Sequence, residues 1–180
     1  MHIAEGLTTG TLQALDLHPH KIKLIDQQAM RLGLTTVKAE ALDARKAGER
    51  FEAESFDRIL VDAPCSGLGV IRRKPDIKWT KRPEQLEQLP KIQRDILTSV
   101  LPLVKKGGTF VYSTCTIDPV ENEEQTAFIL SQGFDFDASF ATRMPESVRH
   151  LIGDRAELKL LPTTVGTDGF YIAAFKKRED

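Results

Sequence analysis

The stretch GGTFVYSTCTIDPVENE, residues 107–123, runs from two glycines through an apolar, β-branched and aromatic segment to a cysteine. Residues of these types favour a β-strand, and Asp118 and Pro119 mark where such a strand has ended. A helix is expected next, because acidic side chains suit the positive end of a helix dipole. Its first turn would hold Pro119, Glu121, Glu123 and Glu124. The stretch therefore predicts a strand that carries Cys115 at its carboxyl end.

Helical and strand patterns alternate through the rest of the chain, which is typical of an α/β domain with a mostly parallel sheet. Strands are predicted at 11–17, 36–43 and 56–62, and helices at 19–34 and 83–104. The last segment, 157–177, predicts two antiparallel strands joined by turn residues. Residues 46–55, KAGERFEAES, are interpreted as a mobile surface loop. We therefore expect one α/β domain over residues 1–180.

The composition, 41% hydrophobic and 28% charged residues in a chain of 180, fits a single globular domain. The formal net charge is −1, from 25 basic and 26 acidic residues, so contact with nucleic acid requires a local basic patch. Two cysteines do not make a disulfide framework, and no secretory signal pattern opens the sequence. No apolar run approaches the ~20 residues of a membrane span. These features predict a cytoplasmic protein that has no contact with a membrane and no metal site.

Four side chains lie at or just beyond the predicted strand ends, namely Asp16, Asp43, Asp62 and Cys115, and Cys65 follows Asp62 by three residues. Open parallel sheets bind ligands outside the carboxyl ends of their strands. A crossover through the 83–104 helix would make the Asp62 and Cys115 strands neighbours, ~4.8 Å apart. Taken singly, a cysteine is more often a small buried apolar residue, and an aspartate at a strand end is more often a turn residue. Their convergence is what favours a site.

Two local strings carry a family resemblance: DAPCSG at 62–67 and STCT at 113–116. They resemble the fourth and sixth motifs of the RNA 5-methylcytosine methyltransferases of the Sun/Fmu (NOL1/NOP2/Sun) family. ALDLHPHKIKLI, ALDAR and GTDGFYIAAFKK are similar to further motifs of these enzymes, so the resemblance covers essentially the whole chain. Within the family it is closest to the bacterial small-subunit rRNA cytosine methyltransferases. The resemblance implies a Rossmann-like class I methyltransferase fold.

The family chemistry explains the residue types. Carbon 5 of cytosine is a poor nucleophile, so a thiolate first adds to carbon 6, after which carbon 5 accepts the methyl group of S-adenosylmethionine. The resemblance implies that Cys115 is the nucleophile and that Cys65 assists release of the product. It places Asp62 at the polar edge of the cytosine and near the cofactor. It assigns Asp16 to the ribose hydroxyls and Asp43 to the adenine amino group.

The segment IRRKPDIKW, residues 71–79, is the densest basic patch and contains the lone tryptophan, Trp79. Its cations are Arg72, Arg73, Lys74 and Lys78. A run of charges is usually a solvated face, but a position directly after a catalytic motif favours contact with RNA phosphates. The target base must also leave its stack. The sequence leaves two interpretations of Trp79 open, a base-stacking platform and a core anchor.

One motif of the family has no counterpart in the chain. The family's catalytic domain begins with a strand and a loop of the form Ala-Ala-Pro-Gly-Gly-Lys, whereas MHIAEGL at 1–7 resembles the helix after that loop. The chain therefore resembles a C-terminal catalytic fragment that lacks the central strand between the Asp16 and Asp62 strands. Because each unpaired buried backbone group costs ~1 to 3 kcal/mol, we expect direct pairing of those two strands, or a strand exchanged from another chain, rather than a gap.

Two functions of different class stay open. The first is a methyltransferase domain, and the second is an inactive fragment or module that binds RNA or a protein partner without methyl transfer. A cysteine hydrolase is disfavoured, because neither cysteine motif contains a histidine that could act as the base. His18, His20 and His150 all lie elsewhere in the sequence.

Overall fold

The computed structural model describes residues 1–80, 82–153 and 155–179. Its strands are β1 (Leu12–Asp16), β2 (Val37–Ala41), β3 (Phe56–Asp62), β4 (Val104–Thr114), β5 (Phe134–Phe136), β6 (Glu157–Leu160) and β7 (Phe170–Lys177). Its α-helices are α1 (His2–Glu5), α2 (Pro19–Arg31), α3 (Ala47–Arg50), α4 (Ile77–Thr80), α5 (Pro83–Val100), α6 (Glu123–Ser131), α7 (Phe140–Arg143), α8 (Glu146–Arg149) and α9 (Pro162–Val165). Short 3₁₀ turns lie at η1 (Ala44–Lys46), η2 (Leu68–Val70) and η3 (Leu101–Leu103). None of the described helices is long and apolar enough to cross a lipid bilayer.

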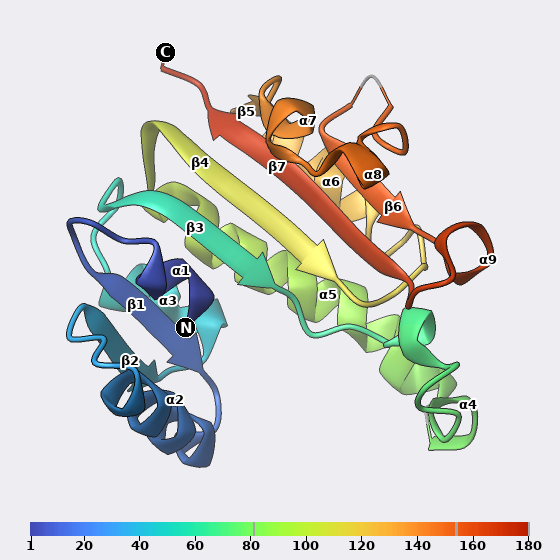
Figure 1. Cartoon of the computed structure of the whole chain (residues 1–180), viewed down its shortest axis with the longest axis horizontal. Helices are drawn as coiled ribbons and strands as arrows, with labels where there is room; N and C mark the ends of the chain where they lie inside the picture. The colour runs from blue at the N-terminus through green and yellow to red at the C-terminus, as the bar shows by residue number, and fades with distance from the viewer. Residues whose placement is uncertain (81, 154, 180) are drawn as a thin grey trace.

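The strands form two sheets (Figure 1). In the first, β1 and β2 pair in parallel. In the second the order is β3-β4-β7-β5, with β6 also paired to β7. The β3 and β4 strands are parallel neighbours, whereas β7 runs antiparallel to β4, β5 and β6. The α/β fold, the adjacency of the Asp62 and Cys115 strands and the antiparallel C-terminal pair are therefore confirmed.

The expectation that the Asp16 and Asp62 strands would pair directly is wrong. In the described part of the chain β1 and β3 belong to separate sheets and share no ladder. The penalty for a gap assumed that β3 would be buried, but much of β3 is exposed, and Leu60 keeps 50% of its surface in solvent. Water can therefore satisfy the backbone groups along this edge. The unpaired edge of β3 therefore costs less free energy than a buried unpaired edge would.

Tertiary packing on α5 joins the two sheets. Ala47 is 1% exposed and belongs to the main core, together with Leu97 and Val100 of α5. The Gly48 N–H donates to Ser99 Oγ at 2.9 Å, and a Cβ at Gly48 would lie 3.2 Å from the Ser99 carbonyl oxygen. The interpretation of 46–55 as a surface loop is therefore wrong for its first half. Residues 47–50 form α3, because small side chains there allow close packing on α5.

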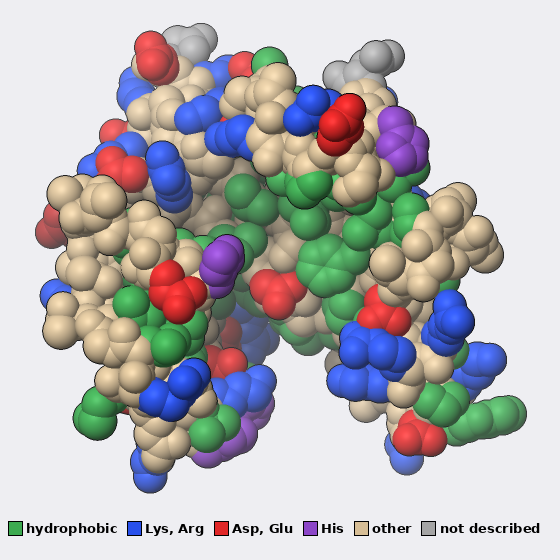
Figure 2. All heavy atoms as spheres, in the orientation of Figure 1, with side chains coloured by type: hydrophobic (Ala, Val, Ile, Leu, Met, Phe, Trp, Pro, Cys, Tyr) green, Lys and Arg blue, Asp and Glu red, His purple; other side chains and the backbone are tan. Residues whose placement is uncertain are grey.

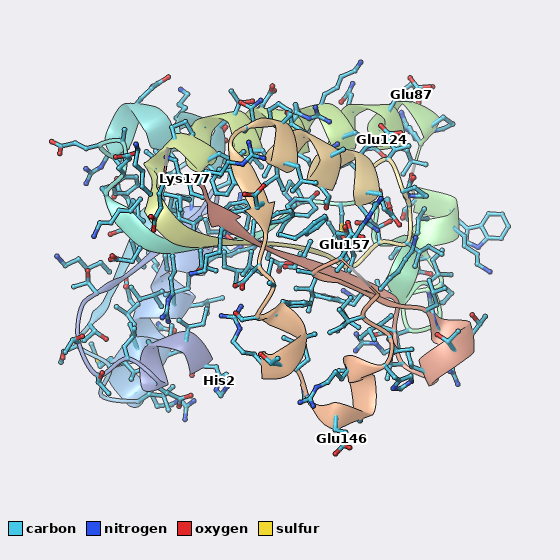
Figure 3. All side chains as sticks on the ribbon, turned by 90° about the horizontal axis from the view of Figure 1, so that it is seen from above. His2, Glu87, Glu124, Glu146, Glu157 and Lys177 are labelled. Atoms are coloured by element: carbon cyan, nitrogen blue, oxygen red, sulfur yellow. The ribbon has the colours of Figure 1, made fainter. Side chains whose placement is uncertain are left out.

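Helices cover both faces of the larger sheet, as Figure 3 shows. The main core lies between the sheet and the α5 and α6 face, where Phe110 and Tyr112 of β4 are fully buried. Val111, which points the other way, packs in a second cluster with Phe140 of α7 and Leu158 of β6. The carboxyl-terminal half of β4 is therefore packed on both faces, and the parallel ladder with β3 places the ends of the two strands side by side.

Candidate active site

The carboxyl ends of β3 and β4 bring the two cysteines together. The ladder pairs Asp62 with Ser113, and the Ala63 N–H donates to the Ser113 carbonyl oxygen at 2.9 Å. Cys65 and Cys115 follow these residues, both are half-buried free thiols, and their Sγ atoms lie 3.4 Å apart. Neighbouring parallel strands therefore place both thiols within reach of one small group.

The two thiols differ in acidity. The hydrogen bond with Cys65 lowers the pKa of Cys115 to about 7, against opposing effects of burial and of the nearby Asp62 carboxylate. The same hydrogen bond, together with burial, raises the pKa of Cys65 far above its ordinary value. The Lys74 cation also favours the Cys115 thiolate. Cys115 is therefore the thiol that ionises first, and Cys65 donates its proton toward it.

Asp62 lies beside the thiol pair and is exposed. Its Oδ1 accepts a hydrogen bond from the Ser113 hydroxyl at 3.1 Å, which fixes the carboxylate at the end of β3. The second carboxylate oxygen has no hydrogen-bond partner among the described residues and faces solvent. A ligand with an amino or imino group could donate to that oxygen.

Three loops form one hydrogen-bonded cluster around Cys115. The Gly69 N–H donates to the Cys115 carbonyl oxygen at 3.0 Å, and the Gly169 N–H donates to the Gly69 carbonyl oxygen at 2.8 Å. A Cβ at Gly69 would lie 2.3 Å from the Gly169 oxygen, so only glycine fits there. Arg73 and Asp168 add an ion pair between the same loops. Gly69 of the SGLG string and Gly169 of the TDG string are thus in direct backbone contact.

Asp16 and Asp43 lie at the carboxyl ends of β1 and β2, on the two-stranded sheet and not on the sheet that carries Asp62 and the cysteines. Burial raises the pKa of Asp16, yet a hydrogen bond from the His18 N–H at 2.9 Å and the nearby Lys21 outweigh it and hold the pKa below its usual range. Arg45 lowers the pKa of Asp43 through side-chain hydrogen bonds. In the described chain neither aspartate is hydrogen-bonded to Asp62 or to a cysteine. The structure therefore holds the predicted residues in two separate groups, one on each sheet.

The basic segment 71–79 forms an arm that ends in α4. Figure 2 shows Lys and Arg side chains gathered on this arm at the lower right, with a hydrophobic side chain projecting beside them. Arg72, Arg73, Lys74 and Lys78 are all exposed, and Arg73 also forms an ion pair with Asp168. Trp79 is 86% exposed, so its interpretation as a core anchor is wrong. The four-residue helix stands off the sheet and leaves the indole without a core to enter.

Sequence reasoning missed the buried polar residues under the site. Glu121 was assigned to the first turn of a helix, but α6 begins at Glu123 and Glu121 is 1% exposed beneath the Cys65 loop. Gln93 of α5 is also fully buried there. The carboxylate of Glu121 accepts hydrogen bonds from Gln93 and from Ser66, which is 55 residues away in sequence. Spacing along the chain gives no signal for such a contact.

Comparison with known proteins shows the family of the chain. A model of the family described as 16S rRNA methyltransferase RsmB/F matches residues 1–176. The chain belongs to this family. The "Probable ribosomal RNA small subunit methyltransferase B" of Bacillus subtilis is 55% identical over 180 residues, and the match covers 98% of the chain and 40% of that protein. The corresponding protein of Vibrio vulnificus is 38% identical over 180 residues, with 98% and 39% covered.

The fold comparison leads to the same family. The crystal structure of NSun6 from Pyrococcus horikoshii with SFG, an S-adenosylmethionine analogue, is 29% identical, with a TM-score of 0.79 over 99% of this chain and 44% of that one. The chain thus has a Rossmann-like α/β methyltransferase fold. It spans about 40% of the length of the Bacillus and Vibrio relatives.

Proposed function

We propose that this domain transfers a methyl group from S-adenosylmethionine to carbon 5 of a cytosine in small-subunit rRNA, through a covalent cysteine–cytosine adduct. The observation that carries the proposal is the Cys65–Cys115 pair at 3.4 Å, with Cys115 as the more acidic thiol. The relatives named as small-subunit rRNA methyltransferases support the choice of RNA. The two free thiols suit a reducing cytoplasm.

The residues of the chain divide the chemistry between them. The Cys115 thiolate forms an S–C6 bond with the cytosine, and the electron pair of the C5=C6 bond makes carbon 5 nucleophilic. Asp62 accepts a hydrogen bond from the polar edge of the base. After carbon 5 has been methylated, it gives its proton to water, the electron pair of the broken C–H bond re-forms the C5=C6 bond, and the S–C6 bond breaks so that the Cys115 thiolate leaves. Cys65, which keeps its own proton at neutral pH, donates a hydrogen bond to the departing thiolate.

The described residues fit one end of the cofactor. Asp16 ends β1 and Asp43 follows β2, which is where dinucleotide folds hold a ribose and a base. One carboxylate oxygen of Asp16 accepts a hydrogen bond from the His18 N–H, and the other lies 3.4 Å from Lys21 Nζ. Both oxygens keep lone pairs that can accept hydrogen bonds from ribose hydroxyls. Asp43 is shared with Arg45 and would reach the adenine amino group through its remaining lone pairs. When bound there, S-adenosylmethionine supplies the methyl group.

The arm supplies the RNA contact in this proposal. Arg72, Lys74 and Lys78 bind phosphates, and Trp79 stacks on an unpaired base. Arg73, which is also exposed, is a fourth phosphate contact in this proposal, and its ion pair with Asp168 links the arm to the loop before β7. A non-catalytic RNA-binding module would keep the arm and would have no use for two thiols of unequal acidity.

Variants of the two cysteines test the proposal in a chain extended by the N-terminal part of the Bacillus subtilis relative. We expect Cys115→Ala to abolish methylation and to abolish trapping on RNA that contains 5-fluorocytosine. We expect Cys65→Ala to accumulate an adduct with ordinary RNA, seen as a band that survives denaturing electrophoresis. Loss of the adduct in Cys65→Ala and its survival in Cys115→Ala would mean that the two roles are exchanged. RNA binding without any methylation or adduct would favour the non-catalytic module.

A further inference from the structure

We propose that Glu121 is a positioning residue that holds Cys65 against Cys115, acting through Gln93 and the backbone of the Cys65 loop. Its meaning for catalysis rests on the proposed function, but the geometric claim does not. Glu121 is 1% exposed, and its Oε2 accepts two hydrogen bonds, from the Ser66 N–H at 2.9 Å and from Gln93 Nε2 at 2.8 Å. The carboxylate therefore binds the residue that directly follows Cys65.

Gln93 holds the other side of the loop. Its Nε2 also donates to the Pro64 carbonyl oxygen at 2.9 Å, so both hydrogens of the amide are used on the loop and on Glu121. The opposite orientation of the amide would turn its oxygen toward two acceptors, so these partners fix it. Among the described residues, the buried Gln93 Oε1 has no hydrogen-bond partner, which is a cost that its two donated hydrogen bonds must offset. The residues before and after Cys65 are thus both fixed.

The neighbouring residue, Asn122, holds the other cysteine loop. Its Oδ1 accepts from the Thr114 hydroxyl at 2.6 Å, and its Nδ2 donates to the Thr116 carbonyl oxygen at 3.1 Å. Two consecutive residues of the turn before α6 therefore fix the two thiol loops, Glu121 the first and Asn122 the second. The Ser66 and Thr116 hydroxyls, 2.7 Å apart, add a direct link. The turn sets the distance between the Sγ atoms.

A buried carboxylate at position 121 needs a physical reason. No described side chain forms an ion pair with Glu121, and burial of an uncompensated acidic group is costly. A carboxylate oxygen can accept two hydrogen bonds at one point, which is what the Ser66 N–H and Gln93 require. Glutamine at this position would also present an oxygen to both donors, whereas alanine would leave both unpaired. The proposal therefore predicts a shifted Cys115 pH profile for the alanine variant and a nearly unchanged one for the glutamine variant.

Alkylation of the 180-residue chain with iodoacetamide tests the geometry without cofactor or RNA, with each thiol followed by mass spectrometry of its peptide. Because the Cys65 proton keeps Cys115 acidic, we expect Glu121→Ala to slow Cys115 alkylation about ten-fold at pH 7 and to move its pH profile upward. Glu121→Gln should stay within about two-fold of wild type, and the exposed Glu124→Ala serves as the matched control.

If Glu121→Ala does not fold, Gln93→Met tests the same role. It keeps the bulk of the side chain and removes its hydrogen-bond donors, so it should also slow Cys115 alkylation. In the extended chain, Glu121→Ala should accumulate the covalent adduct as Cys65→Ala does, whereas simple loss of stability would lower methylation without any adduct. If no variant methylates RNA, the thiol profiles still decide the positioning role. An unchanged Cys115 profile in folded Glu121→Ala and Gln93→Met would overturn it.

Discussion

At the residue scale, the acidity of Cys115 comes from one neighbouring proton. The nearest side chains have opposing effects, because Asp62 disfavours the Cys115 thiolate and Lys74 favours it, while the Cys65 hydrogen bond has the largest influence. A thiolate that is half-buried yet hydrogen-bonded is stable enough to form at neutral pH and exposed enough to attack. Cys65 therefore influences the ionisation of Cys115 before any substrate is bound.

This view predicts how Cys115 responds to pH when Cys65 changes. The thiolate fraction rises as pH passes the pKa, so alkylation of wild-type Cys115 should increase through about pH 7. Without the donor, Cys65→Ala should move that midpoint up by at least one pH unit, toward the ordinary thiol value of about 8.5. Cys65→Ser keeps a donor, so its midpoint should lie between the two. Equal midpoints in all three proteins would show that Cys65 does not set the acidity of Cys115.

At the element scale, the loops of the site depend on one close backbone contact. Gly69 and Gly169 belong to loops 100 residues apart in sequence, and the Gly69 Cα lies 2.7 Å from the ideal Cβ position of Gly169. Gly69→Ala should destabilise the domain by about 2 to 4 kcal/mol, because backbone atoms cannot move aside as a flexible side chain can. Urea unfolding measures the loss. Gly153→Ala, where a Cβ meets nothing within 4 Å, is the control and should change stability by less than about 0.5 kcal/mol.

The arm around α4 gives a second prediction at this scale. Replacing both Arg72 and Lys78 with Ala should lower the slope of log K against log salt for single-stranded RNA by about 1.4, since each phosphate contact contributes about 0.7. The control is a double variant, Lys23→Ala with Lys38→Ala, which removes two exposed charges from α2 and β2. It should leave the slope unchanged. Trp79 is the sole tryptophan, so quenching of its fluorescence by RNA would report stacking directly. Unquenched fluorescence at saturating RNA would exclude Trp79 as the platform.

Local sequence signals account for the elements that were predicted well. The 56–62 strand matches β3 at both ends because its residue types and the following Asp-Ala-Pro mark it locally, and Pro83 marks the start of α5 in the same way. The three-residue β5 was not predicted, because a short edge strand has too few residues to show a pattern. Glu121 and α3 were misassigned, since their contacts with Ser66 and Ser99 depend on distant parts of the fold.

At the scale of the whole molecule, the predicted site is divided between two sheets. Asp16 and Asp43 lie on the β1–β2 unit, while Asp62 and both cysteines lie on the larger sheet. The strands β1, β3 and β4 all run toward the same edge of the molecule in Figure 1, so their carboxyl ends face one region. The units are joined through α3 and α5 rather than by strand pairing. Any ligand that contacts both groups of residues must therefore bridge the two sheets.

That division predicts weak binding of S-adenosylmethionine by the 180-residue chain. Asp16 and Asp43 contact only the nucleoside in the proposed site, so few contacts are available to offset the entropy that the cofactor loses on binding. We expect isothermal titration to give an affinity at least about 100-fold weaker than that of a chain extended by the N-terminal part of the Bacillus subtilis relative, in which further residues can bridge β1 and β3. In the extended chain, Asp16→Asn should weaken binding without lowering the thermal midpoint, which separates loss of a ligand contact from loss of folding. Micromolar affinity in the 180-residue chain would show instead that the β1–β2 unit alone provides most of the cofactor site.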